Sequence, residues 1–256
     1  MKLILLTKRS LVTLGLSLMI GVTAATVAIT STVKAVQTAA EPRKIPVYRV
    51  ESDKKQVAIS FDAAWGNEQT EDLLRILDEH KVKATFFLVG DWVDKFPDDV
   101  VTIAQKGHDI GNHSNTHPHM PQLAAEEATA EITSCNDKIK ALTGKSPTLF
   151  RPPYGDYNNM VVDSVKKLGM YCVQWDVDSL DWKDPSPEQM TKTVLDKVQD
   201  GSIVLMHNGA KNTPAALPSI IEGIKDKGYE IVLIKDLIPE GEYYTDVQGE
   251  LHLMEN

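Results

Sequence analysis

Short apolar segments alternate with amphipathic segments along most of this chain, and this alternation constrains its fold more than any other feature. The apolar segments predict strands at 56–61, 83–90, 107–113, the start of 149–155, 171–176, 201–208 and 230–234. The amphipathic segments predict helices at 70–77, 97–106, 123–142, 158–168, 187–198 and 217–227. Strands and helices in this order predict an α/β fold, with a parallel sheet covered by helices. Six or seven such units predict a distorted (β/α) barrel of about seven parallel strands, slightly short of the eightfold barrel.

The first 40 residues differ from the rest of the chain. Lys2, Lys8 and Arg9 precede a stretch, 11–29, that contains no charged residue, and small residues follow at 33–35 and 38–40. This layout is typical of a secretory signal peptide, although the stretch is also long enough to act as an uncleaved membrane anchor. We therefore expect an exported protein of the cell envelope, either secreted or membrane-anchored, whose contact with the membrane is confined to this segment.

The remaining residues are acidic. Residues 1–40 hold four Lys and Arg and no Asp or Glu, which leaves 23 basic and 36 acidic residues, a net charge of −13, for the rest. Such a domain is not expected to bind nucleic acid, and a neutral substrate suits it better. We expect an export segment at 1–40, a linker at 41–54 with two prolines, a folded domain at 55–237 and a polar tail at 238–256.

Cys135 and Cys172 are the two cysteines of the chain. In an exported protein they could form a disulfide, but neither has the spacing of a metal ligand. Cys172 lies in an apolar run, which favours buried thiols.

His113 and His117 are separated by three small polar residues and form a candidate clamp for a divalent metal ion. Neutral imidazole is a common ligand for zinc-like ions, and a spacing of four residues can direct both rings to one point. Two solvated surface histidines would give the same pattern.

Six polar residues lie at or just after the ends of predicted strands. The carboxyl ends of parallel strands meet on one face of a barrel, so these residues are expected to share one cleft. They are Asp62, His113, His117, Arg151, Asp181 and His207.

Five sequence motifs that contain these residues resemble, in order and spacing, the motifs of the polysaccharide deacetylases, the NodB-homology domain of carbohydrate esterase family four. The motifs are Phe61-Asp62, His113-Ser114-Asn115-Thr116-His117, Arg151-Pro152-Pro153-Tyr154-Gly155, Asp178-Ser179-Leu180-Asp181-Trp182 and Leu205-Met206-His207. The resemblance covers residues 55–237. The sequence of 61–66 is similar to that of the sporulation-associated, PdaB-like branch.

The resemblance implies hydrolysis of an N-acetyl group on an amino sugar, and together with the export pattern it indicates cell-wall peptidoglycan as the substrate. His113 and His117 would hold a divalent ion, zinc or alternatively cobalt or nickel, which polarises the acetyl carbonyl and acidifies a water. Asp62 would be the general base, oriented by Arg151.

The same resemblance implies roles for the remaining motif residues. His207 would be the general acid, oriented by Asp181. The backbone N–H of Tyr154 would stabilise the oxyanion. Leu205 and Trp182 would wall the pocket for the acetyl methyl group, and Trp65 would offer a further surface for the glycan.

One residue departs from the family pattern. The first motif usually has two adjacent aspartates, of which the second is a metal ligand, but the second position here is Ala63. The site could bind metal weakly through two histidines and water, His119 or Asp62 could fill the gap, or metal binding could be lost. The alternatives to an enzyme are a glycan-binding pseudoenzyme and a domain with a structural metal.

Overall fold

The computed structural model describes residues 41–254, so the expected export segment at 1–40 lies outside the described residues. The chain divides into two compact units, Met1–Arg43 and Lys44–Asn256, and the second is the folded domain. Within the described range, no helix has the length and apolar character needed to cross a membrane.

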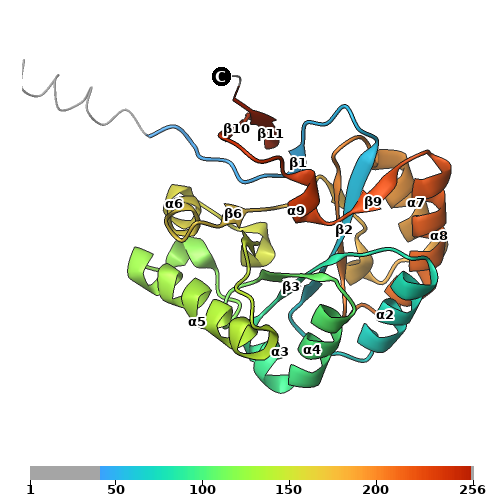
Figure 1. The fold of residues 1–256 in the computed structure, drawn as a ribbon, viewed down its shortest axis with the longest axis horizontal. Coiled ribbons are helices and arrows are strands. Elements are labelled where there is room, and N and C mark those ends of the chain that lie inside the picture. The colour runs from blue at the N-terminus through green and yellow to red at the C-terminus, as the bar shows by residue number, and fades with distance from the viewer. Residues whose placement is uncertain (1–40, 255–256) are drawn as a thin grey trace, which may run out of the picture. The chain divides into compact units, whose positions relative to one another are not determined.

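A curved parallel sheet forms the centre of the domain (Figure 1). Its strand order is β6-β5-β4-β3-β2-β8-β7, and every pairing in it is parallel. The strands are β2 (Gln56–Ala63), β3 (Thr85–Leu88), β4 (Asp109–Asn112), β5 (Leu149–Phe150), β6 (Tyr171–Cys172), β7 (Val177–Asp178) and β8 (Ile203–His207). A further strand, β9 (Glu230–Val232), pairs with the first residues of β2. The predicted distorted (β/α) barrel is therefore confirmed.

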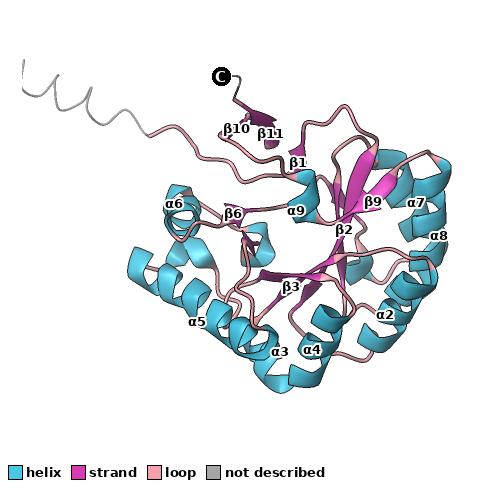
Figure 2. Ribbon diagram, in the orientation of Figure 1, coloured by secondary structure: helices cyan, strands magenta, loops and turns pink. Residues whose placement is uncertain are grey.

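Helices surround the outside of this sheet (Figure 2). They are α2 (Thr70–Glu79), α3 (Gly90–Lys95), α4 (Pro97–Gln105), α5 (Ala125–Thr143), α6 (Asn159–Lys167), α7 (Pro187–Lys197) and α8 (Thr213–Asp226). The short helix α9 (Ile234–Leu237) packs instead in a second apolar cluster, with Ala58 and Phe87. Single 3-10 turns form η1 (Met120–Gln122), η2 (Pro153–Gly155) and η3 (Asp181–Lys183). α8 begins four residues before the predicted start, because a proline in the first turn of a helix is compatible with helical geometry.

The central strand β2 separates two environments. Val57, Ile59 and Phe61 belong to the apolar cluster under the helices. Successive side chains of a strand point to opposite faces, so Ser60 and Asp62 point to the inside of the barrel. Their strand thus places two polar side chains inside the barrel, on the face opposite to its apolar cluster.

Two segments outside the expected domain at 55–237 also form strands. Within the expected linker, β1 (Arg49–Val50) pairs with β11 (Glu250–Leu253), and within the expected tail β10 (Tyr243–Thr245) pairs with β11. Val50 and Leu251 are buried in this small sheet, and burial of these apolar side chains explains why both segments fold onto the domain.

Val47 and Arg49 also bridge the two sides of the barrel, because Val47 pairs with Val173 after β6 and Arg49 pairs with Ser202 before β8. Residues 47–50 therefore pair with the residues beside β6 and β8.

Cys135 and Cys172 are free and buried, so they do not form a disulfide with each other. Burial raises the pKa of the Cys135 thiol to about 12 and also raises that of Cys172. Both thiols are therefore protonated at neutral pH and poorly reactive.

Candidate active site

The carboxyl ends of β2 and β8 place Asp62 beside His207. These strands are adjacent and parallel, and Asp62 and His207 are partners in their register. His113 and His117 follow β4, Arg151 follows β5, and Asp181 follows β7 on η3. The structure thus brings all six predicted catalytic and metal-binding residues to the same edge of the sheet.

Arg151 is fully buried inside the barrel. One of its NH groups donates to Asp62 Oδ1 at 2.7 Å, and the other donates to Ser60 Oγ at 2.9 Å and to the Gln174 carbonyl at 3.0 Å. Its guanidinium carbon also lies 4.0 Å from the ring centroid of Phe87. These three hydrogen bonds hold both terminal NH groups of the buried guanidinium, so the orientation of Arg151 is fixed.

Asp62 is held in its ionised form. Burial on its own would raise the pKa of the Asp62 carboxyl, but the charges of Arg151, His113 and His207 and the hydrogen bond from Arg151 outweigh burial and lower it. Arg151 occupies Oδ1, whereas Oδ2 lies 3.5 Å from His113 Nε2. Oδ2 is therefore the oxygen that faces the histidine pair.

The two histidines point their Nε2 atoms at each other across 3.3 Å. His113 Nδ1 lies 2.7 Å from the Arg151 carbonyl, which fixes the tautomer: Nδ1–H donates, and the lone pair is on Nε2. Burial lowers the pKa of His113. Burial, followed by the proximity of His113, lowers the pKa of His117 to about 4. Both rings are therefore neutral at pH 7, which is the form that binds metal.

His207 is bound on one side by a buried carboxylate. Its Nδ1 lies 2.7 Å from Asp181 Oδ1, and its backbone N–H donates to Asp181 Oδ2 at 2.6 Å. Thr213 Oγ1 donates to the same Oδ2 at 2.9 Å, so Asp181 has three partners. Burial alone would lower the pKa of His207, but the hydrogen bond and charge of Asp181 outweigh burial and raise it. His207 can thus carry a proton on Nε2.

Exposed aromatic rings lie on two sides of these groups. Trp65 packs on His207 with 5.1 Å between ring centroids, and Tyr154 packs on His117 at 4.5 Å. Trp182 follows Asp181 on η3, and all three aromatic rings are about half exposed or more. Leu205 is buried two residues before His207, on the same face of β8. These are the four residues predicted to contact substrate.

Comparisons with known proteins identify the family of this chain. The family model for "Polysaccharide deacetylase" matches residues 49–173. The peptidoglycan-N-acetylglucosamine deacetylase of Bacillus cereus is 35% identical over 72% of this chain and 69% of its own length. This chain belongs to the polysaccharide deacetylase family. A CE4 family pseudoenzyme from Bacillus anthracis has a crystal structure that matches with a TM-score of 0.73 and 38% identity, over 75% of this chain and 68% of that one.

Some relatives of this chain are longer. Peptidoglycan-N-acetylglucosamine deacetylase PgdA of Listeria monocytogenes is 36% identical over 79% of this chain, but that match covers only 44% of its own length. The first curated relatives are thus covered over 40–61% of their length.

The family resemblance implies a divalent ion, and the histidine pair has the right geometry for one. Two nitrogens that bind a tetrahedral zinc at about 2.0–2.1 Å lie about 3.3 Å apart. His113 Nε2 and His117 Nε2 have this separation. The carbonyl that fixes the tautomer of His113 is also typical of a metal-binding histidine.

Among residues 41–254, no third protein ligand accompanies this pair. Ala63 is fully buried, and its methyl group has no lone pair. His119 does not fill the gap, because it stacks on Tyr154 at 4.3 Å and its Nδ1 lies 3.2 Å from Asp156. Asp62, His113 and His117 also do not form a group of three whose ligand atoms all lie within 4.8 Å of one another. The residues fit a metal held by two nitrogens, with its other positions open.

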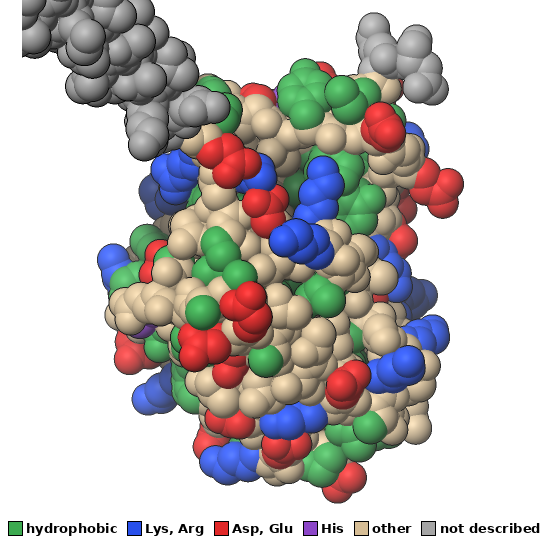
Figure 3. Space-filling model, turned by 90° about the vertical axis from the view of Figure 1, so that its left-hand side faces the viewer, with side chains coloured by type: hydrophobic (Ala, Val, Ile, Leu, Met, Phe, Trp, Pro, Cys, Tyr) green, Lys and Arg blue, Asp and Glu red, His purple; other side chains and the backbone are tan. Residues whose placement is uncertain are grey.

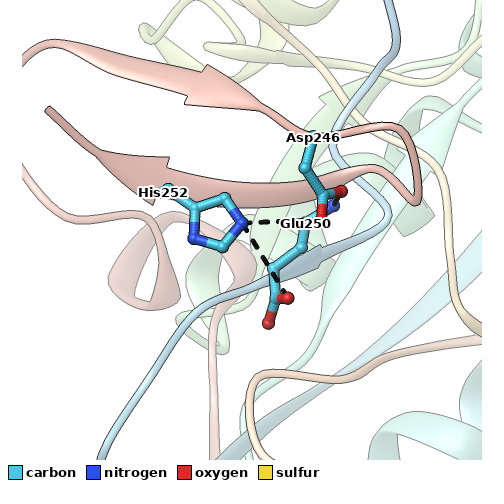
Figure 4. A group of neighbouring side chains, drawn as sticks. All are labelled: Asp246, Glu250 and His252. Atoms are coloured by element: carbon cyan, nitrogen blue, oxygen red, sulfur yellow. Dashed lines mark hydrogen bonds and ion pairs between the residues drawn. The ribbon is translucent and has the colours of Figure 1, made fainter.

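The described residues contain one such group of three, and it lies in the small C-terminal sheet (Figure 4). Asp246, Glu250 and His252 form it, and His252 Nδ1 lies 2.7 Å from Glu51. Arg49 binds Glu250 at 2.6 Å. The Arg49 guanidinium thus pairs with one of these carboxylates, and the cluster ties β11 to β1 and the residues beside it.

Four residues that the sequence reasoning missed hold this site together. Ser60 and Gln174 bind Arg151, Thr213 binds Asp181, and Glu131 on α5 binds the loop between the histidines. Ser60 could have been found, because it lies two residues before Asp62 and strand alternation places both on one face. The other three belong to none of the five motifs and have no local signal.

Proposed function

We propose that this polysaccharide deacetylase hydrolyses the acetamide of N-acetylated amino sugars in a cell-wall glycan, releasing acetate and a free amine. One observation carries this proposal: a carboxylate held ionised by Arg151 and an imidazole held by Asp181 lie on adjacent strands, next to a pair of neutral histidines. Amide hydrolysis needs a base for water and an acid for the leaving amine, and these are the two groups supplied.

Asp62 would be the base. Its Oδ1 is bound to Arg151, so Oδ2, which faces the histidine pair, would accept the proton from water. The lowered pKa of Asp62 keeps the carboxylate ionised, while burial keeps it dry and able to accept a proton.

His207 would be the acid. Its Nδ1–H is committed to Asp181, which leaves Nε2 to deliver a proton to the nitrogen of the breaking C–N bond. The raised pKa of His207 keeps this proton available near neutral pH.

His113 and His117 would hold the divalent ion, zinc, cobalt or nickel, which when bound polarises the acetyl carbonyl and lowers the pKa of a water. The Tyr154 N–H would donate to the developing oxyanion, a contact of the kind that contributes about 3–4 kcal/mol to transition-state stabilisation. Tyr154 has φ 60°, and a non-glycine residue is held in this left-handed conformation only by its surroundings. Leu205 and Trp182 would flank the acetyl methyl group, and Trp65 and Tyr154 would contact the sugar.

The proposed substrate is peptidoglycan, at the cell envelope. Relatives named as peptidoglycan deacetylases and the exported pattern of residues 1–40 support it. On the face of the domain shown in Figure 3, acidic and basic side chains are intermingled. A role in sporulation is supported by the sequence of 61–66.

A second candidate function is glycan binding without hydrolysis. Two observations favour it: Ala63 removes the usual third ligand, and this chain is similar to a CE4 family pseudoenzyme. The complete Asp62–Arg151 and His207–Asp181 pairs favour the enzyme, because a binding protein needs neither an activated base nor an acid.

Acetate release separates the two functions. We would incubate purified protein with zinc, cobalt or nickel and with N-acetylglucosamine oligomers or peptidoglycan, and measure acetate. We expect metal-dependent acetate release, which chelation abolishes. If glycan binds but no metal supports acetate release, the protein is the pseudoenzyme.

A further inference from the structure

Every backbone N–H between the two histidines has a side-chain acceptor. Ser114 N–H donates to Asn112 Oδ1 at 2.7 Å, and His117 N–H donates to Ser114 Oγ at 3.0 Å. Asn115 and Thr116 both donate to Glu131 Oε2, at 2.9 and 2.8 Å. Thus the two N–H groups in the middle of the loop donate to a residue of α5, whereas the other two donate to side chains of the adjoining chain.

Glu131 binds this loop with both of its oxygens. In addition to the two N–H groups on Oε2, the hydroxyl of Thr116 donates to Oε1 at 2.9 Å. Its helix, α5, is itself fixed to the barrel, because Asn112 Nδ2 donates to the Ile132 carbonyl at 2.7 Å. The carboxylate therefore holds the loop from a rigid base.

The loop needs such support because its backbone is strained. Ser114 has φ 69° and His117 has φ 61°, in the left-handed region that non-glycine residues rarely adopt. On the opposite side, the first residues of α3 also hold it, since Gly90 N–H donates to the Ser114 carbonyl at 2.9 Å. The loop is thus clamped between α3 and α5, and Glu131 is the charged part of this clamp.

We propose that Glu131 is the positioning residue that sets the His113–His117 pair for its metal ion, an inference that rests on the proposed function. Because Ala63 stands in place of a third ligand, the protein would bind the metal through two imidazole nitrogens. The affinity for the metal would then depend on the distance between these two nitrogens. Glu131 fixes the chain midway between them and so fixes that spacing.

The test is a cobalt titration, followed by visible absorption, of the full chain and three variants. Glu131→Ala removes all three hydrogen bonds, whereas Glu131→Gln keeps an oxygen for the N–H groups, and Thr116 can turn its hydroxyl to accept from the amide. Glu127→Ala is the matched control, because Glu127 on the same helix also accepts a backbone N–H, from Ala124 at 2.8 Å. Thermal unfolding shows that each variant is folded.

We expect cobalt affinity to fall about 10- to 100-fold in Glu131→Ala, as for other residues that orient metal ligands. Glu131→Gln should recover most of this affinity, and Glu127→Ala should bind as wild type. Wild-type affinity and an unchanged cobalt spectrum in folded Glu131→Ala would overturn the proposal, whether or not the protein releases acetate.

If the wild-type chain binds no cobalt, the metal part of the proposed function fails, and the positioning role is tested without metal. Ring nitrogen resonances of His113 and His117 and amide exchange of Thr116 report the loop directly. We expect both to change in Glu131→Ala and to return in Glu131→Gln. Unchanged resonances and exchange in Glu131→Ala would overturn the role of Glu131.

Discussion

Arg151 and Asp62 form a buried ion pair whose disruption should be costly. Replacing Arg151 by Met leaves the Asp62 carboxylate buried without its partner, which typically destabilises a protein by about 3–5 kcal/mol. The variant also loses the hydrogen bonds from Arg151 to Ser60 Oγ and to the Gln174 carbonyl. We therefore expect urea unfolding of Arg151→Met at a clearly lower midpoint than wild type.

A double-mutant cycle isolates the pair. Asp62→Asn leaves the Arg151 charge uncompensated and should cost a similar amount, whereas the double variant buries no charge. Its cost should therefore lie about 2–3 kcal/mol below the sum of the single costs. Lys192→Met is the control, because Lys192 and Asp196 form an ion pair that is largely exposed, and its loss should change stability by less than about 1 kcal/mol.

The same pair should set the sign of a pH dependence. Because the pKa of Asp62 is lowered in the folded protein, its stabilising contribution is present above the unfolded pKa of about 3.9 and is lost as pH falls through the lower folded value. Without Arg151, we expect burial to raise the pKa of Asp62 above its unfolded value. The contribution of Asp62 to the free energy of unfolding should then decrease as pH rises. The reasoning would be refuted if the losses in unfolding free energy of the two single variants added up to that of the double variant within about 0.5 kcal/mol. It would also be refuted if the dependence of unfolding free energy on pH were the same in Arg151→Met as in the wild type.

Three further predictions follow from the site and the fold. Asp181→Asn should lower the pKa of His207 and move the basic limb of the kcat/KM profile to lower pH; an unshifted limb contradicts the pairing. Ala63→Asp should increase cobalt affinity at least about tenfold, measured against Ala63→Asn, which adds a similar volume without charge; equal affinities mean that position 63 does not face the metal. Leu251→Ala should lower the free energy of unfolding by about 2–5 kcal/mol, and a change below about 0.5 kcal/mol would show that the C-terminal sheet is not part of the core.

The barrel could be predicted because its signal is local. The strand at β2 and the helix at α5 each show their own periodicity, and parallel strands order themselves by simple connection rules. The small sheet of β1, β10 and β11 was missed because its strands have two to four residues. Glu250-Leu251-His252-Leu253 does alternate polar and apolar residues, but so short a pattern is common in loops.

The residues of the candidate site could be predicted, but not the network that supports them. Asp62 and His207 carry motifs, and strand ends of a parallel sheet meet on one face. Glu131 and Gln174 belong to no motif. Their contacts with the site depend on where α5 and the loop after β6 lie in the folded domain, and local sequence does not determine this. The left-handed backbone of Ser114 and His117 was also invisible, since neither residue type requires it.

The central claim is that this site hydrolyses an N-acetyl group, and the most direct measurement is the simultaneous count of acetate and free amine released from an N-acetylglucosamine oligomer. With the metal that supports activity, we expect the two products in equal amounts from the wild-type chain. Asp62→Asn, with metal and glycan still bound, should release them at least about 100-fold more slowly, the contribution of a general base. Release at the wild-type rate in Asp62→Asn, or glycan binding without either product in the wild type, would contradict the account.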